Sequence, residues 1–227
     1  MAVIAAAPNE RHNTVEPAAS GIPSMHLRKT AAVLAMAAAT GLGLAASAAP
    51  KSAAQFTADG KLVFPADYRT WVYLSTGLDM SYRDTAPGVN HAFDSVFVNR
   101  EAYEGYTKTG TWPNGTVMVL EVRKGQSKGS INQAGVFQTD LLGAEVHVKD
   151  TARFKKDGWA FFPRRAGEEA SKALPETSDC NVCHEQHGAV DTTFVQFYPT
   201  LMPKAQEMKT LAASYLAEEA AKAASGK

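Results

Sequence analysis

Five short segments with the composition of β-strands do most to limit what this chain can fold into. They are rich in β-branched and aromatic side chains and are bounded by glycine, proline, asparagine or aspartate, which is typical of strands in an antiparallel sheet. They span residues 70–74, 93–98, 116–122, 144–148 and 158–163. This strand-rich pattern excludes a four-helix bundle.

Helices are predicted at three other places. Asn99 is a suitable N-cap and Gly110 a suitable stop for a short helix between them. Residues 167–174 also suit a helix, and residues 203–224, rich in alanine, leucine, glutamate and lysine, predict a C-terminal helix. We therefore expect an α+β fold, a mostly antiparallel β-sheet with a few helices.

The N-terminal stretch has the pattern of a secretory signal. A basic segment at residues 25–29 precedes an uncharged, alanine-rich run that ends at Leu44, and the small residues 46–48 suit cleavage. The run is shorter than the about 20 residues that cross a bilayer. We expect a mature protein outside the cytoplasm and, after cleavage, outside the membrane. The predicted parts are a signal peptide with an upstream extension at 1–48, a folded domain at 49–202 and a C-terminal helix or tail at 203–227.

Charge and cysteine content exclude two further classes of protein. The chain has 23 basic and 23 acidic side chains and no formal net charge, whereas nucleic-acid binding needs clustered lysine and arginine to neutralise phosphates. Its only two cysteines lie three residues apart, which rules out a scaffold held by several disulfides. The two cysteines therefore have a role other than holding such a scaffold.

The pair belongs to a Cys-x-x-Cys-His motif at residues 180–184, the attachment motif of c-type haem. Cys180 and Cys183 would each add to a vinyl group of haem as a thioether, and His184 would bind the iron as an axial ligand. One covalent haem c near the C-terminus is the predicted cofactor. An export signal agrees with it, because this attachment takes place outside the bacterial cytoplasm. The alternatives are a disulfide, a thioredoxin-like redox pair, or a zinc site that includes His187.

The position opposite His184 decides what such a haem can do. Met202 and Met208 are the candidate sixth ligands, and either would give an electron-transfer cytochrome, but both suit packing of the C-terminal helix better. His187 would lie on the same side of the haem as His184 and is expected at the surface or near a haem propionate. Without a sixth protein ligand, the iron would keep an open face for a small ligand.

Several segments, in a consistent order over roughly residues 56–201, resemble the cytochrome P-460 family. The resemblance implies a periplasmic, mostly antiparallel β-protein, often a dimer, whose five-coordinate haem binds nitric oxide or oxidises hydroxylamine. It also implies Cys180 and Cys183 as the haem attachments and His184 as the proximal iron ligand. The resembling segments are residues 64–72, 106–110, 115–117, 148–150, 153–154, 158–161, 180–184 and 197–199.

One position departs from the family pattern. In the hydroxylamine-oxidising members a lysine after the Gly-Thr-Val strand start is cross-linked to the haem, and alignment on residues 115–117 places Leu120 there. Lys124 shares that strand face and Lys108 lies in a turn, and both suit the surface better. The resemblance is therefore closer to the cytochrome c′-beta branch, which has no cross-link and has an apolar distal wall that admits nitric oxide. Phe93 and Leu120 are the candidate wall residues, with core packing as the other interpretation.

The predicted function is that of a periplasmic c-type haem protein that binds nitric oxide or a similar small nitrogen ligand at an open distal iron site. A hydroxylamine-oxidising enzyme and an electron-transfer cytochrome are the alternatives. Glu145 and His147 are the only polar pair on one strand face that could serve as a distal acid and base, although a solvated face is the favoured interpretation. Besides the nitrogen ligand, a redox partner such as another cytochrome and a second copy of the chain, in a homodimer, are the expected partners.

Overall fold

The computed structural model describes residues 54–82, 91–165 and 167–226, and all of them belong to one compact unit, Ala48–Lys227. The predicted signal peptide at residues 1–48 lies outside the described residues. None of the helices in the described ranges is long and apolar enough to cross a membrane.

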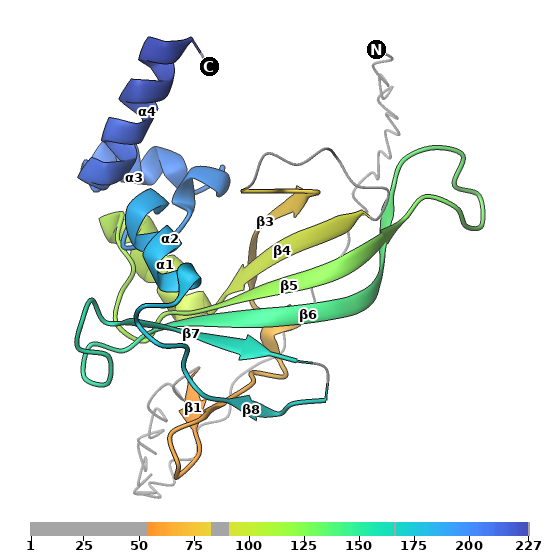
Figure 1. Cartoon of the computed structure of the whole chain (residues 1–227), viewed down its shortest axis with the longest axis horizontal. Coiled ribbons are helices and arrows are strands. Elements are labelled where there is room, and N and C mark those ends of the chain that lie inside the picture. Colours follow the sequence, from red (N-terminus) through yellow and green to blue (C-terminus); the bar gives the residue numbers. More distant parts are fainter. Residues whose placement is uncertain (1–53, 83–90, 166, 227) are drawn as a thin grey trace, which may run out of the picture. The chain divides into compact units, whose positions relative to one another are not determined.

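A five-stranded antiparallel sheet forms the centre of this unit (Figure 1). Each strand pairs with the next one along the chain, and each of the five predicted segments overlaps one strand. The strands are β3 (Val72–Leu78), β4 (Ala92–Val98), β5 (Val117–Gln126), β6 (Phe137–Lys149) and β7 (Trp159–Arg164). The predicted α+β fold with an antiparallel sheet is confirmed.

A small three-stranded sheet lies beside the central one. It consists of β1 (Gln55–Phe56), β2 (Leu62–Val63) and β8 (Ala170–Ser171), and a short 3-10 helix, η1 (Tyr68–Thr70), follows β2. The helix predicted over residues 167–174 is therefore wrong. The backbone of β8 pairs with β2, a distant part of the chain, and this pairing outweighs the helix propensity of the local sequence.

Helix α1 (Arg100–Thr109) begins and ends where predicted. Gly110 follows it with φ of 73°, the left-handed conformation that ends many helices. Asn99 precedes it, but its side-chain oxygen accepts from the Val117 N–H at 2.8 Å instead of from the helix. Asn99 thus ties the start of α1 to the start of β5.

The single helix predicted over residues 203–224 is two helices, α3 (Met202–Met208) and α4 (Ala213–Ser225). Lys209 ends α3 with φ of 57°, and the Thr210 hydroxyl donates to the carbonyl of the glycine that ends α1, at 2.7 Å. This contact with the end of α1 holds the turn between α3 and α4. The prediction was wrong because helix propensity does not include such a tertiary anchor.

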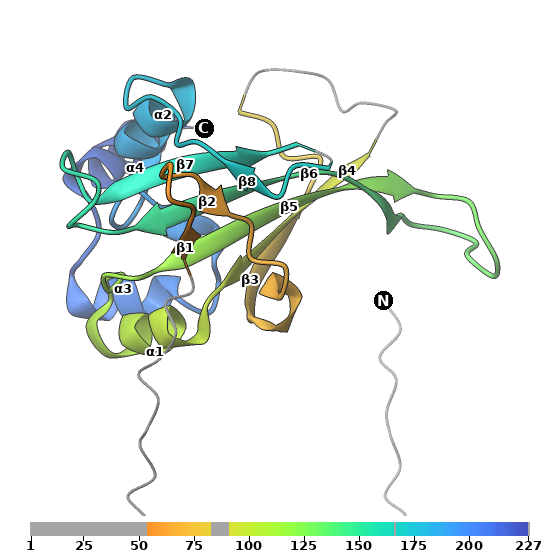
Figure 2. The ribbon, with the colours of Figure 1, turned by 90° about the horizontal axis from the view of Figure 1, so that it is seen from below.

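Alternate side chains of the sheet enter two different cores. On β5, Val117 and Val119 face the core shared with the small sheet, whereas Met118 faces the core that the helices cover. Helix α2 (Asp179–His187) and the other helices gather at one end of the central sheet, and the β5–β6 turn projects from the other end (Figures 1 and 2). The helix-covered face is the one that holds the candidate site.

A buried carboxylate, Glu121, links η1 to the middle of the sheet. It is 1% exposed, and it accepts from Arg123 Nε at 2.7 Å, from Arg69 Nη1 at 2.5 Å and from the Tyr68 hydroxyl. Burial by itself raises the pKa of Glu121, but the hydrogen bonds from Arg123, Tyr68 and Arg69 together outweigh it and lower the pKa below its ordinary value of 4.5.

Replacing Glu121 with glutamine is expected to destabilise the folded protein by about 1–2 kcal/mol near neutral pH, because charged hydrogen bonds are lost. Since the folded-state pKa is lowered, the contribution of Glu121 is complete above pH 4.5 and disappears as the pH falls through the folded-state value. Denaturant unfolding between about pH 7 and about pH 3 should show the difference from wild type shrinking in acid. Glu104→Gln, an exposed change on α1, is the control. A difference that stays constant with pH would contradict this account.

Candidate haem-binding site

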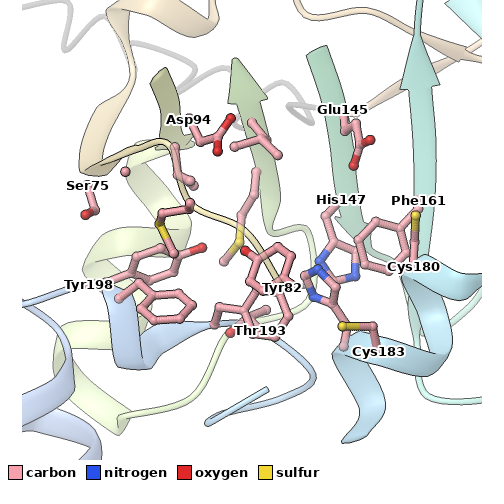
Figure 3. A pocket seen from close by; sticks show the side chains of 18 of the residues that line it. Ser75, Tyr82, Asp94, Glu145, His147, Phe161, Cys180, Cys183, Thr193 and Tyr198 are labelled. Carbon is pink, nitrogen blue, oxygen red and sulfur yellow. The ribbon is translucent and has the colours of Figure 1, made fainter. Parts of the chain in front are cut away.

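Helix α2 presents the Cys-x-x-Cys-His motif on one face. Ser178 caps the start of the helix by accepting the Asn181 N–H. Residues three and four apart share a helix face, so Cys180, Cys183 and His184 point the same way. All three line one cavity of about 510 Å³. Figure 3 shows the two cysteines in its wall.

The helix-covered face of the central sheet forms one wall of the cavity. A bulge on β3 between Tyr73 and Ser75 changes the alternation there, so that Ser75 and Gly77 face the cavity. The segment after α2 supplies further walls. Besides the motif and Asp179, the lining consists of Ser75, Gly77, Met80, Tyr82, Asp94, Val96, Met118, Leu120, Glu145, His147, Phe161, Thr193, Phe194, Phe197 and Tyr198.

The His184 ring is fixed in the form that binds a metal. Aromatic rings surround it, with centroids 4.1 Å away in Phe194, 4.6 Å in Phe161 and 5.3 Å in His147. Its Nδ1 lies 2.8 Å from the Thr192 carbonyl oxygen, which can only accept, so Nδ1 carries the proton and Nε2 keeps its lone pair. Burial lowers the pKa of His184 to about 4, against the opposing effect of the Thr192 hydrogen bond. The imidazole is therefore neutral at ordinary pH.

The two thiols do not have the properties of a redox pair. Cys180 and Cys183 are both half-buried and are not bonded to each other. Burial raises the pKa of both thiols, and the nearby Glu145 carboxylate adds to the rise at Cys180. Catalytic redox cysteines need a lowered pKa, because the thiolate is the reactive form. The environment therefore favours neutral thiols.

The donor set fits haem c better than a bare metal ion. Within the described ranges no group of three or more His, Cys, Asp and Glu side chains could hold a metal ion. One neutral imidazole beside two thiols, in a cavity of a size usual for organic ligands, is instead what a c-type haem requires. Cys180 and Cys183 would hold the haem and His184 would be the iron ligand. When bound, the haem supplies an iron that can bind small ligands and change oxidation state.

The two predicted wall residues differ in their placement. Leu120 lines the cavity, between Val96 of β4 and Glu145 of β6 in the strand register. Phe93 does not line the cavity, so the prediction that it forms part of the cavity wall is wrong. Asp94, the next residue on β4, faces the cavity, and because side chains alternate along a strand, Phe93 lies on the opposite side of the sheet.

The candidate sixth ligands from the C-terminal helix do not reach the cavity. Met202 packs against the core under the helices, and Met208 is an exposed residue at the end of α3. Two other methionines, Met80 and Met118, line the cavity. The sequence did not single them out as ligands, because a methionine in a strand (Met118) or just after one (Met80) carries no local signal of a ligand. His187 lies at the surface, as predicted, where its Nδ1 meets Glu218 of α4 at 2.8 Å.

Three polar groups make part of the cavity lining polar. Glu145 and His147 share a strand face as expected, but that face lines the cavity and is not a simple solvated surface (Figure 3). His147 is buried, and its Nε2 has no hydrogen-bond partner among the described residues. Asp94 was not foreseen. Burial raises the pKa of Asp94, aided by Asp79, and burial likewise raises that of Glu145, aided by Asp94, although Glu145 as a whole is exposed.

Comparison with known proteins agrees with the donor set. Residues 65–195 match the family model described as Cytochrome P460, a segment that contains the central sheet and the Cys-x-x-Cys-His motif. No curated protein sequence matches the chain. The matched segment covers more than half of the 227 residues, and membership implies a haem protein of the c type. The chain belongs to the cytochrome P460 family.

Proposed function

We propose that this chain is an exported c-type haem protein that binds nitric oxide, or a similar small nitrogen ligand, at an open iron site without a lysine cross-link. The observation that carries the proposal is Leu120 in the wall of the cavity. The cavity lining drawn from the described residues contains no lysine. A leucine side chain has no amine to bond to the haem ring, so a conventional haem c is expected.

The surroundings of Leu120 support a diatomic ligand. Val96, Met118 and Leu120 are apolar neighbours across β4 and β5. These three side chains offer no hydrogen bond to polar bound dioxygen, whereas nitric oxide does not need one. The His184 ring is held in a metal-binding form, which supports this residue as a protein ligand of the iron.

The test is the absorption spectrum of the purified haem-loaded protein, ferrous and with nitric oxide added, together with the mass of its tryptic haem peptides. We expect a conventional Soret band, a clear change on addition of nitric oxide, and a single haem peptide that contains Cys180 and Cys183. A strongly red-shifted Soret band with a second peptide joined to the haem would contradict the proposal. A low-spin spectrum that nitric oxide leaves unchanged would instead favour electron transfer, with Met80 or Met118 as the sixth ligand.

Hydroxylamine oxidation is the second candidate function. The observation that favours it is the presence of two carboxyl groups, Asp94 and Glu145, in the cavity lining. Oxidation of hydroxylamine releases protons, and a carboxylate that faces the cavity can accept them; burial raises the pKa of both carboxyl groups, which makes each a stronger base. Both side chains face the cavity (Figure 3). The proton-transfer role, unlike nitric oxide binding, depends on a titrating group.

Asp94→Asn and Glu145→Gln separate the two candidates. If the protein oxidises hydroxylamine, each change should lower the rate by roughly 10²-fold or more, as expected for loss of a general base, and should leave nitric oxide binding close to wild type. Steady-state oxidation rates and nitric oxide titrations measure this, with Glu104→Gln as the exposed control. Unchanged oxidation rates in both variants would show that these carboxylates take no part in the reaction.

A further inference from the structure

The turn that supplies the backbone partner of His184 is strained. Asp191 and Thr192 have φ of 48° and 56°, and the Thr193 N–H donates to the Val190 carbonyl at 2.8 Å, which defines a type I′ turn. Aspartate tolerates this conformation, whereas the β-branched Thr192 adopts it at an energetic cost. The Thr192 hydroxyl is also buried without a hydrogen-bond partner among the described residues. Such a position persists only where the surrounding structure holds it.

A charged pair holds one side of this turn. Lys149, near the end of β6, donates from Nζ to Asp191 Oδ2 at 3.1 Å and to the Trp112 carbonyl at 2.8 Å. The same Asp191 oxygen accepts from the Trp112 backbone N–H at 2.9 Å. The Lys149 side chain is 15% exposed, so solvent screens this pair less than it screens a surface pair.

The Trp112 side chain holds the other side of the turn. Its indole Nε1 donates to Thr193 Oγ1 at 2.8 Å, and that hydroxyl donates to the Val190 carbonyl at 2.6 Å. Both Trp112 and Thr193 are buried. The two ends of the turn are therefore fixed to the sheet and to the segment after α1, and the Thr192 carbonyl between them faces His184.

We propose that Lys149 and Asp191 are positioning residues for the haem iron, because they hold the strained turn that aims the Thr192 carbonyl at His184 Nδ1. A hydrogen bond from this nitrogen makes an imidazole a stronger electron donor to a metal. A stronger donor strengthens the iron–histidine bond and stabilises the oxidised iron, which lowers the reduction potential. This role depends on the c-type haem of the family and not on which ligand binds the open site.

The test uses the haem-loaded Lys149→Met and Asp191→Asn variants. The readouts are the iron–histidine stretching frequency of the ferrous protein, by resonance Raman spectroscopy, and the reduction potential. We expect a lower frequency and a higher potential in both variants, and values close to wild type in Lys149→Arg, which keeps the charge. Lys156→Met is the matched control: it breaks a contact of a lysine with Glu185 on α2 but leaves the turn untouched, and we expect no shift.

Wild-type frequency and potential in both variants would overturn the proposal, and so would an equal shift in Lys156→Met. If Lys149→Met does not fold, Asp191→Asn decides the question alone, because asparagine keeps the size of aspartate and tolerates the left-handed conformation. Nitric oxide is not used in either measurement. Failure of the proposed ligand binding is therefore distinguishable from failure of the positioning role.

Discussion

Replacing Cys180 and Cys183 together with serine is expected to remove all covalently bound haem from the protein. Both thiols line the cavity from one face of α2, and a serine hydroxyl of nearly the same size cannot form the thioether. Extraction of the denatured protein with acidified organic solvent should then release all haem, and the intact mass should equal that of the polypeptide. Each single serine variant is the control, because one thioether remains and the haem should stay with the chain.

The double variant also tests the cross-link directly. If a lysine or another side chain were bonded to the haem ring, haem would remain on the polypeptide after both cysteines are removed. Retention of haem in the double variant would therefore contradict the conventional haem c that Leu120 predicts. Peptide mapping of the retained haem would then identify the residue that was bonded to it.

Local signals explain what the sequence predicted correctly. The five strands were predictable because β-branched and aromatic residues cluster between turn residues, and the central sheet is formed by neighbours along the chain. The limits of α1 were predictable because Asn99 and Gly110 are residues typical of the two ends of a helix, although only Gly110 plays the expected part: the Asn99 side chain binds β5 instead of capping the helix. That Cys180, Cys183 and His184 lie on one face of a helix follows from their spacing, which needs no tertiary information.

Contacts between distant parts of the chain explain what the sequence could not predict. The segment that forms β8 has ordinary helix propensity, and only its partner β2, about a hundred residues earlier, makes it a strand. The division of the C-terminal helix depends on Thr210 reaching the end of α1. Propensity averages over local sequence and does not contain such contacts.

The lining of the cavity differs in detail from what the sequence predicted. Phe93 was assigned to the cavity although its neighbour Asp94 faces it, because an error of one residue exchanges the two faces of a strand. Met80 could not be foreseen, since it follows a strand whose alternation a bulge changes. The support of His184 by the 190–193 turn had no sequence signal, because its partners Lys149 and Trp112 come from other parts of the chain.

Replacing Gly188 with alanine is expected to destabilise the folded protein by about 3 kcal/mol, at the upper end of the usual cost of overpacking. Gly188 follows α2, and a Cβ there would lie 2.6 Å from the His184 carbonyl oxygen, 2.7 Å from the Thr192 carbonyl carbon and 2.8 Å from the Thr193 nitrogen. All three are backbone atoms, so no side-chain rotation relieves the contact. The end of α2 and the 190–193 turn must both shift to make room, and we expect the hydrogen bond from His184 Nδ1 to the Thr192 carbonyl to lengthen.

Thermal unfolding of the haem-loaded protein measures this effect, and a loss of about 3 kcal/mol should lower Tm by roughly 6–12 °C for a chain of this size. The reduction potential should rise at the same time, because the displaced carbonyl weakens electron donation by His184. Gly143→Ala is the matched control: a Cβ at this strand position meets only the Arg164 carbonyl oxygen, at 3.9 Å, so little change is expected. Equal Tm values for the two variants would show that close contact between α2 and the turn does not stabilise the fold. A lower Tm with an unchanged potential would show that the turn supports the fold without tuning His184.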